Sequence, residues 1–111
     1  MPRAYATAKG YTRRNAKVDA NQKAIVKALE EIPGVTVVPI GKPLDLLIGF
    51  QGITHIVEIK NPDGKDQVND DQQKFIDSWT GRRPEVARSL ADVLDIIGAS
   101  VSSLAVTRVP L

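Results

Sequence analysis

Two carboxylates and a lysine near the middle of the chain have a spacing that suits a cation site. Asp45 lies in one apolar run and Glu58 and Lys60 lie in the next, and Gln51-Gly52 between them favours a tight hairpin. A two-residue hairpin loop places Asp45 opposite Glu58, with Cβ atoms about 4.5–5.5 Å apart, and Lys60 on the same side of its strand. Two carboxylates in an apolar sheet repel each other and are costly to desolvate. A divalent cation would compensate them, and oxygen ligands suit Mg²⁺ or Mn²⁺.

Two glutamines lie on the apolar stripes of predicted helices. Gln22 falls on the stripe of a helix before the hairpin, and Gln72 falls on the stripe of a helix after it. Both are expected to point toward the sheet and to converge on the carboxylates. Taken alone, each glutamine also fits a helix-edge or capping residue, and Glu58 with Lys60 also fits an ion pair on an exposed strand. The combination of two carboxylates, one lysine and two glutamines favours a functional site over these separate explanations.

The hydrophobic pattern predicts the elements that would position these side chains. Helices are expected over 17–32, 70–79 and 89–98, and strands over 35–40, 44–50, 53–60 and 85–88. Asn69 with Gln72 predicts a capping box for the second helix, and Ser89 predicts another for the third. Residues 104–109 fit a further strand or a dimer contact. The order indicates a mixed α/β domain with helices covering a central sheet.

Strand alternation predicts which side chains share the face of the carboxylates. Leu47 and Ile56 are expected beside them, and His55 is expected on the opposite face as a packing residue. Phe75 and Trp79 are interpreted as core residues of the second helix and not as base-stacking groups. Five apolar residues are expected on the opposite face: Leu44, Leu46, Ile48, Val57 and Ile59.

Composition excludes several classes of protein. The chain has 111 residues, of which 42% are apolar and 25% are charged, which is typical of one small globular domain. It has no cysteine and one histidine, so disulfides, thiolate zinc sites and sites with two histidines are excluded. No apolar run approaches the roughly 18 residues of a membrane span, and residues 1–17 contain no apolar block. We therefore expect a cytoplasmic protein with no membrane partner.

Charge is distributed unevenly along the chain. Residues 1–27 carry seven of the fifteen Lys and Arg and one of the thirteen acidic residues, a net charge of +6, whereas the remainder carries −4. We divide the chain into a basic arm, residues 1–15, and a single domain, residues 16–111. A basic arm on an acidic body favours an anionic partner, although a solvated tail also fits.

Residues 14–98 resemble the PD-(D/E)xK nuclease superfamily. Pro43-Leu44-Asp45 is followed thirteen residues later by Glu58-Ile59-Lys60, and Asp71-Gln72-Gln73-Lys74-Phe75 and Trp79 follow on the next helix. The pattern is especially similar to small phage and prophage proteins related to archaeal Holliday-junction resolvases and to VRR-NUC domains. The resemblance implies a restriction-endonuclease-like core, a central mixed β-sheet flanked by helices in the order αβββαβ.

The resemblance also implies roles for individual residues. Asp45 and Glu58 would be metal ligands, together with the backbone carbonyl of Ile59. Lys60 would orient or activate the attacking water and stabilise the pentavalent phosphate, and Gln72 would be an accessory catalytic residue.

This sequence departs from the family pattern in two places. Leu44 separates Pro43 from Asp45, and Gln22 stands where relatives often have a glutamate. A neutral amide binds Mg²⁺ more weakly than a carboxylate, so the number of metal ions, one or two, stays open.

The function implied is a Mg²⁺-dependent (or Mn²⁺-dependent) DNA endonuclease that hydrolyses phosphodiester bonds and selects DNA by structure. Arg13, Arg14 and Lys17 would contact the DNA backbone, as would Lys65 in the loop after the third strand. Symmetric cutting of both strands needs two sites, so a homodimer is expected. The substrate is left open between a four-way junction, a flap, a nick and plain duplex. Two alternatives also remain: a non-catalytic DNA-binding or assembly protein with a degenerate nuclease fold, and a protein-interaction domain whose arm is only a solvated tail.

Overall fold

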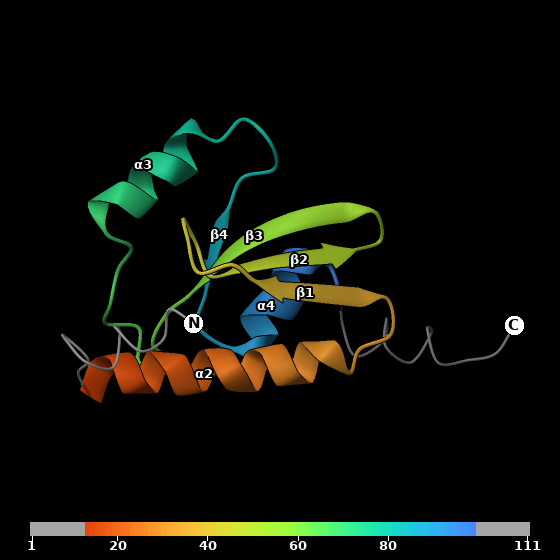
Figure 1. Cartoon of the computed structure of the whole chain (residues 1–111), viewed down its shortest axis with the longest axis horizontal. Helices are drawn as coiled ribbons and strands as arrows, with labels where there is room; N and C mark the ends of the chain where they lie inside the picture. Colours follow the sequence, from red (N-terminus) through yellow and green to blue (C-terminus); the bar gives the residue numbers. More distant parts are fainter. Residues whose placement is uncertain (1–12, 100–111) are drawn as a thin grey trace, which may run out of the picture.

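A computed structural model describes residues 13–99 of the chain. Within this range the elements follow the predicted order (Figure 1). They are α2 (Arg13–Glu30), β1 (Val35–Pro39), β2 (Leu46–Phe50), β3 (Ile53–Ile59), α3 (Asp70–Ser78), β4 (Glu85–Ala87) and α4 (Leu90–Ile97). The predicted α/β class is confirmed. Most of the basic arm, residues 1–12, and the candidate strand at 104–109 lie outside the described residues.

The four strands form one mixed sheet in the order β1-β2-β3-β4. The first two pairs are antiparallel and β3 pairs with β4 in parallel. The hairpin register is the predicted one, because Phe50 pairs with Ile53 and Ile48 pairs with His55. Gln51 and Gly52 both have positive φ, 52° and 80°, which is the conformation that a tight type I′ turn requires. The hairpin prediction is therefore confirmed.

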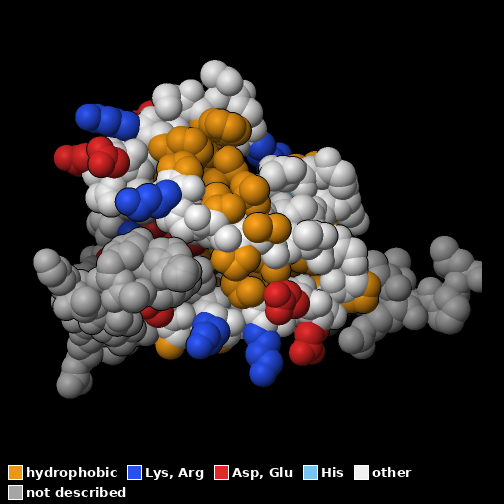
Figure 2. Space-filling model, in the orientation of Figure 1, with side chains coloured by type: hydrophobic (Ala, Val, Ile, Leu, Met, Phe, Trp, Pro, Cys, Tyr) orange, Lys and Arg blue, Asp and Glu red, His pale blue; other side chains and the backbone are white. Residues whose placement is uncertain are grey.

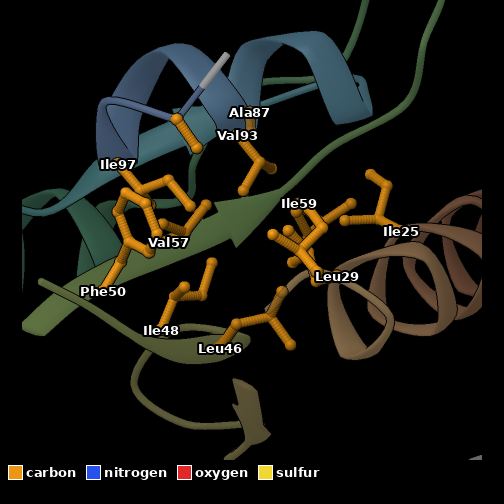
Figure 3. Close-up of a cluster of buried hydrophobic side chains, with 12 residues drawn as sticks. Ile25, Leu29, Leu46, Ile48, Phe50, Val57, Ile59, Ala87, Val93 and Ile97 are labelled. Atoms are coloured by element: carbon orange, nitrogen blue, oxygen red, sulfur yellow. The ribbon is translucent and has the colours of Figure 1, made fainter. Parts of the chain in front are cut away.

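Helices cover both faces of the sheet. In Figure 1, α2 and α4 lie below the sheet and α3 lies above it. The lower face holds the larger core (Figure 3), formed by Ile25, Leu29, Ile32, Leu46, Ile48, Phe50, Val57, Ile59, Ala87, Val93, Ile97 and Ala99. The upper face, here called the α3 face, holds a smaller cluster of Leu44, Ile56 and Ile76.

Three expectations about local structure were wrong. The first helix begins at Arg13 and not at residue 17, because no glycine or proline interrupts residues 13–30. Leu44 is fully buried, but with Ile56 under α3 and not on the opposite face. The reason is that β2 begins at Leu46, so strand alternation does not apply to Leu44. Trp79 is 45% exposed and is not a core residue. It has extended backbone at the C-cap of α3, which takes its side chain off the helical stripe.

The caps of α3 and α4 set where these helices begin. Asn69 and Gln72 form the complete predicted capping box, with Gln72 N–H donating to Asn69 Oδ1 at 2.8 Å and Asn69 N–H donating to Gln72 Oε1 at 3.1 Å. Ser89 Oγ accepts from Asp92 N–H at 3.1 Å, but the Asp92 carboxylate accepts from Arg88 N–H. The second capping box is therefore only half formed.

Within residues 13–99, no helix combines the length and the apolar character needed to cross a bilayer.

Candidate active site

The two predicted carboxylates meet on the α3 face of the sheet. Asp45 directly precedes β2, and Glu58 is near the end of β3, one step beyond the Leu46–Val57 pair. The N–H of Ile59 donates to Asp45 Oδ2 at 2.8 Å, which fixes the Asp45 side chain at the end of β3. Glu58 is only 5% exposed, and its Oε1 atom is buried with no hydrogen-bond partner in the described part of the chain. A buried acceptor of this kind is satisfied by a donor, such as a proton on the neighbouring carboxyl or a bound water, or by a cation.

Burial and charge repulsion together shift the pKa of Asp45. Burial, and next the negative charge of Glu58, raise the pKa of Asp45 from 3.8 to about 7. The hydrogen bond from Ile59 N–H lowers this pKa but does not outweigh the other two effects. Asp45 therefore retains a proton up to near neutral pH unless a cation takes the place of that proton.

Lys60 and Gln72 both contact the same oxygen of Glu58. Lys60 Nζ lies 3.3 Å from Glu58 Oε2, and Gln72 Nε2 donates to that oxygen at 2.7 Å. The amide oxygen of Gln72 is at the same time the acceptor of the capping box with Asn69. The start of α3 thus orients Gln72, and Gln72 orients Glu58. The structure brings together Asp45, Glu58, Lys60 and Gln72, as the sequence pattern predicted.

The prediction for Gln22 was off by one residue. Gln22 makes no hydrogen bond to Asp45, Glu58 or Lys60 among the described residues, and α2 packs on the sheet face opposite to the site. Asn21 reaches the sheet instead, and its Nδ2 donates to the backbone oxygens of Lys60 at 3.0 Å and Arg88 at 3.1 Å. The signal was present in the sequence, because Asn21 lies four residues before Ile25, on the stripe of the larger core.

A second polar group, the Arg88 cluster (Asn61, Asp66 and Arg88), fixes the loop that follows β3. Asn61 N–H donates to both carboxylate oxygens of Asp66, at 3.0 and 3.1 Å. Arg88 Nη1 donates to Asp66 Oδ1 at 2.8 Å and to Asn61 O at 3.0 Å, and Arg88 Nη2 donates to the backbone oxygen of Asp66. Burial alone would raise the pKa of Asp66, but the hydrogen bonds from Asn61 and Arg88 outweigh it and lower that pKa. Sequence reasoning missed this cluster, because polar residues in a loop are usually exposed.

Removal of Arg88 is expected to destabilise the fold. Arg88→Ala removes the charge-assisted hydrogen bonds to Asp66, which is 9% exposed, so we expect a loss of about 2–3 kcal/mol in the free energy of unfolding. The matched control is Arg83→Ala, because Arg83 and Asp77 form a 3.7 Å ion pair whose side chains are 67% and 60% exposed. That pair should contribute less than about 0.5 kcal/mol. Urea unfolding of both variants measures the difference, and equal losses would contradict a structural role for the cluster.

His55 is a packing residue, as predicted. It is 3% exposed and pairs with Ile48, on the face opposite to Glu58. Its Nδ1 accepts from Arg82 Nε at 3.2 Å, while its Nε2 is buried and has no partner within residues 13–99. Burial and the nearby Arg82 charge hold the pKa of His55 below its usual value. A histidine in this environment stays neutral at physiological pH.

The residues predicted to contact DNA lie toward the edges of the described structure. Arg13, Arg14 and Lys17 belong to the first turns of α2, and their side chains lie outside the described part of the chain. Lys65 is exposed in the loop between β3 and α3, and its N–H donates to Asp63 Oδ1 at 2.9 Å.

The donor set at Asp45 and Glu58 fits a hard divalent cation. Both side chains offer oxygen, and the carbonyl of Ile59 faces the same edge of β3 as its N–H, which Asp45 accepts. The described residues contain no group of three or more His, Asp or Glu side chains suited to a metal. A cation here would therefore take two carboxylates and a backbone carbonyl, with water completing the shell.

Comparison of the chain with family models, with curated proteins and with solved structures gives no match. An inference about function must therefore rest on the geometry of the site and on the pattern of the sequence.

Proposed function

We propose that this chain is a DNA endonuclease that depends on Mg²⁺ or Mn²⁺ and has the restriction-endonuclease-like core of the PD-(D/E)xK superfamily. The observation that carries the proposal is the buried Glu58. One of its oxygens faces Lys60 and Gln72, and the other is buried without a partner among the described residues, next to Asp45. A single ion pair on a strand would need neither the second carboxylate nor the glutamine.

Each residue of the site has a separate role in the proposed hydrolysis. Asp45, Glu58 and the Ile59 carbonyl would hold the cation, which when bound lowers the pKa of a water molecule and neutralises charge on the phosphate. Lys60, with its ammonium beside Glu58, orients the attacking water and stabilises the charge that develops on the phosphate. Gln72 keeps Glu58 in position. The attacking water would lose a proton to solvent as it adds to phosphorus, and the bond to the 3′ oxygen would break. That oxygen would take up a proton from solvent, so the products carry a 5′-phosphate and a 3′-hydroxyl.

The basic residues supply the contacts to DNA in this proposal. Arg13, Arg14 and Lys17 at the start of α2 and Lys65 in the loop after β3 would bind phosphates, so affinity should fall steeply with salt. Such contacts carry no sequence information, which favours recognition of DNA structure, including branched DNA. We also propose that the protein is a cytoplasmic homodimer encoded by a phage or prophage.

A cleavage assay on defined substrates tests the proposal. The purified chain is incubated with a four-way junction, a flap, a nicked duplex and a linear duplex of the same sequence, with Mg²⁺, Mn²⁺ or a chelator. We expect metal-dependent products with 5′-phosphates, and none from Glu58→Gln purified in the same way. Absence of cleavage on every substrate, or equal cleavage by Glu58→Gln, would refute the proposal.

A non-catalytic DNA-binding or assembly protein is the second candidate. The observation in its favour is that the site has only two carboxylates among the described residues. The residue of α2 that reaches the sheet is Asn21, whose side-chain amide donates to backbone oxygens and supplies no acidic ligand. A proton shared by Asp45 and Glu58 would satisfy the pair without metal. Mn²⁺ titration separates the candidates, because this second protein would bind DNA but not Mn²⁺ at Asp45.

A further inference from the structure

An aromatic pair opens to solvent on the same helix that carries Gln72. Trp79 is 45% exposed and lies against Phe75, with ring centroids 5.3 Å apart and ring planes inclined by 39°. Figure 2, in the orientation of Figure 1, shows hydrophobic side chains gathered in a band that runs from the region of α3 down across the molecule. A large exposed aromatic surface is uncommon on a protein that has no partner for it.

The indole of Trp79 is held in place by the backbone of Gly81. A Cβ atom at position 81 would lie 2.7 Å from Trp79 Nε1 and 3.3 Å from Trp79 Cε2. Only glycine therefore allows the ring to lie where it does, with Phe75 on one side and the chain at residue 81 on another. A fixed aromatic surface loses little entropy when it binds a flat ligand.

The helix α3 connects Trp79, its C-cap residue, to the candidate site. Gln72 contacts Glu58 directly, and Trp79 follows seven residues later, about 10 Å along the helix axis at ~1.5 Å per residue. A strand whose phosphate lies at Glu58 could therefore bring a nearby base to the indole.

Basic side chains lie close to Trp79 in the chain. Lys74 is exposed on α3, and Arg83 follows the indole by four residues. Arg83 is 67% exposed at the side chain, and its only ion pair among the described residues is the solvent-exposed one with Asp77 at 3.7 Å. An exposed pair of this kind exchanges readily for a phosphate. An aromatic surface next to mobile positive charge fits a nucleic acid better than an apolar protein surface.

We propose that Trp79, supported by Phe75, stacks on an unpaired base of the DNA strand that enters the Glu58 site. The identity of the ligand as DNA rests on the proposed function. The preferred substrate then contains a single-stranded segment next to the bond that is cut.

Binding to single-stranded DNA tests this inference without cleavage. Trp79 is the only tryptophan of the chain, so its intrinsic fluorescence reports directly on the indole. In a chelator, a 12-nucleotide oligothymidylate should quench this fluorescence, and a blunt duplex of equal length should not. By anisotropy of a labelled oligothymidylate, Trp79→Ala should bind about tenfold more weakly, and Trp79→Phe should keep most of the affinity. Gly81→Ala, which displaces the indole, should give an intermediate loss.

Val38→Ala is the matched control. Val38 is 46% exposed, about the same fraction as Trp79, and it pairs with Leu47 on the α3 face. It should leave affinity for oligothymidylate unchanged. Equal binding by Trp79→Ala and the unmodified chain would overturn the inference. So would a fluorescence shift that depends on protein concentration without DNA and is lost in Val38→Ala, because a second copy would then cover the band.

The two proposals fail separately. Quenching by oligothymidylate without any metal-dependent cleavage would support stacking and refute the endonuclease. Metal-dependent cleavage of flapped and blunt DNA at the same rates by Trp79→Ala and by the unmodified chain would support the endonuclease and refute stacking.

Discussion

Lys60→Ala is expected to lower the rate of DNA cleavage by about 10²–10³-fold and to leave Mn²⁺ binding intact or slightly stronger. The ammonium of Lys60 lies 3.3 Å from Glu58 Oε2, so it competes with a cation for the carboxylate while it stabilises charge in the transition state. Glu58→Gln should abolish both cleavage and Mn²⁺ binding. Single-turnover cleavage and calorimetric titration with Mn²⁺ measure the two properties independently.

Lys27→Ala is the control for the removal of a positive charge. Lys27 is exposed in the last turn of α2, which packs on the opposite face of the sheet. Its loss should change cleavage by less than about twofold at constant salt, since only long-range attraction to DNA is affected. A Lys60→Ala enzyme that cuts as fast as Lys27→Ala would remove the lysine from the mechanism.

Stability in the absence of divalent metal is expected to fall as pH rises from about 4 to about 7. The pKa of Asp45 is about 7 in the folded chain and 3.8 for an ordinary aspartate, so the folded state retains a proton that the unfolded chain releases. The unfolded state binds fewer protons across this interval, and the free energy of unfolding decreases with pH by up to about 4 kcal/mol. Urea unfolding between pH 4 and 8 in a chelator measures the change.

Asp45→Asn isolates the contribution of this one group. The amide oxygen can still accept from Ile59 N–H, but there is no carboxylate to ionise, so the variant should be more stable than the unmodified chain at pH 8. The His55 pKa is lowered, so its effect has the opposite sign and is common to both proteins. At pH 8, Mg²⁺ or Mn²⁺ at 100 times its Kd should restore about 2.7 kcal/mol to the unmodified chain and nothing to Asp45→Asn. Equal stabilisation of both would place the metal elsewhere.

The hairpin was the part of the site most open to prediction from sequence. Gln51-Gly52 fixes a two-residue turn, and counting from that turn pairs Leu46 with Val57, so Asp45 and Glu58 are the next residues beyond the last pair. Gln72 could also be placed, because the capping box sets where α3 begins and hence which side chains face the sheet. Local rules of turn and cap geometry were sufficient in both cases.

Other features depend on contacts between distant segments, which a local pattern does not contain. Asn21 meets Lys60 and Arg88 across 39 and 67 positions of the chain. Trp79 was misplaced because the helical stripe was continued one residue too far, onto a C-cap with extended backbone. In each case the error was about one residue, which is enough to exchange a buried side chain for an exposed one.

The unequal size of the two cores has a consequence for motion. α3 buries one side chain, Ile76, against Leu44 and Ile56, whereas α2 and α4 share the larger core beneath the sheet. Local opening of α3 therefore requires less free energy than unfolding of the whole domain. Each opening breaks the bond from Gln72 to Glu58 and admits solvent to the carboxylates, so amide protons of α3 should exchange ahead of those in β2 and β3.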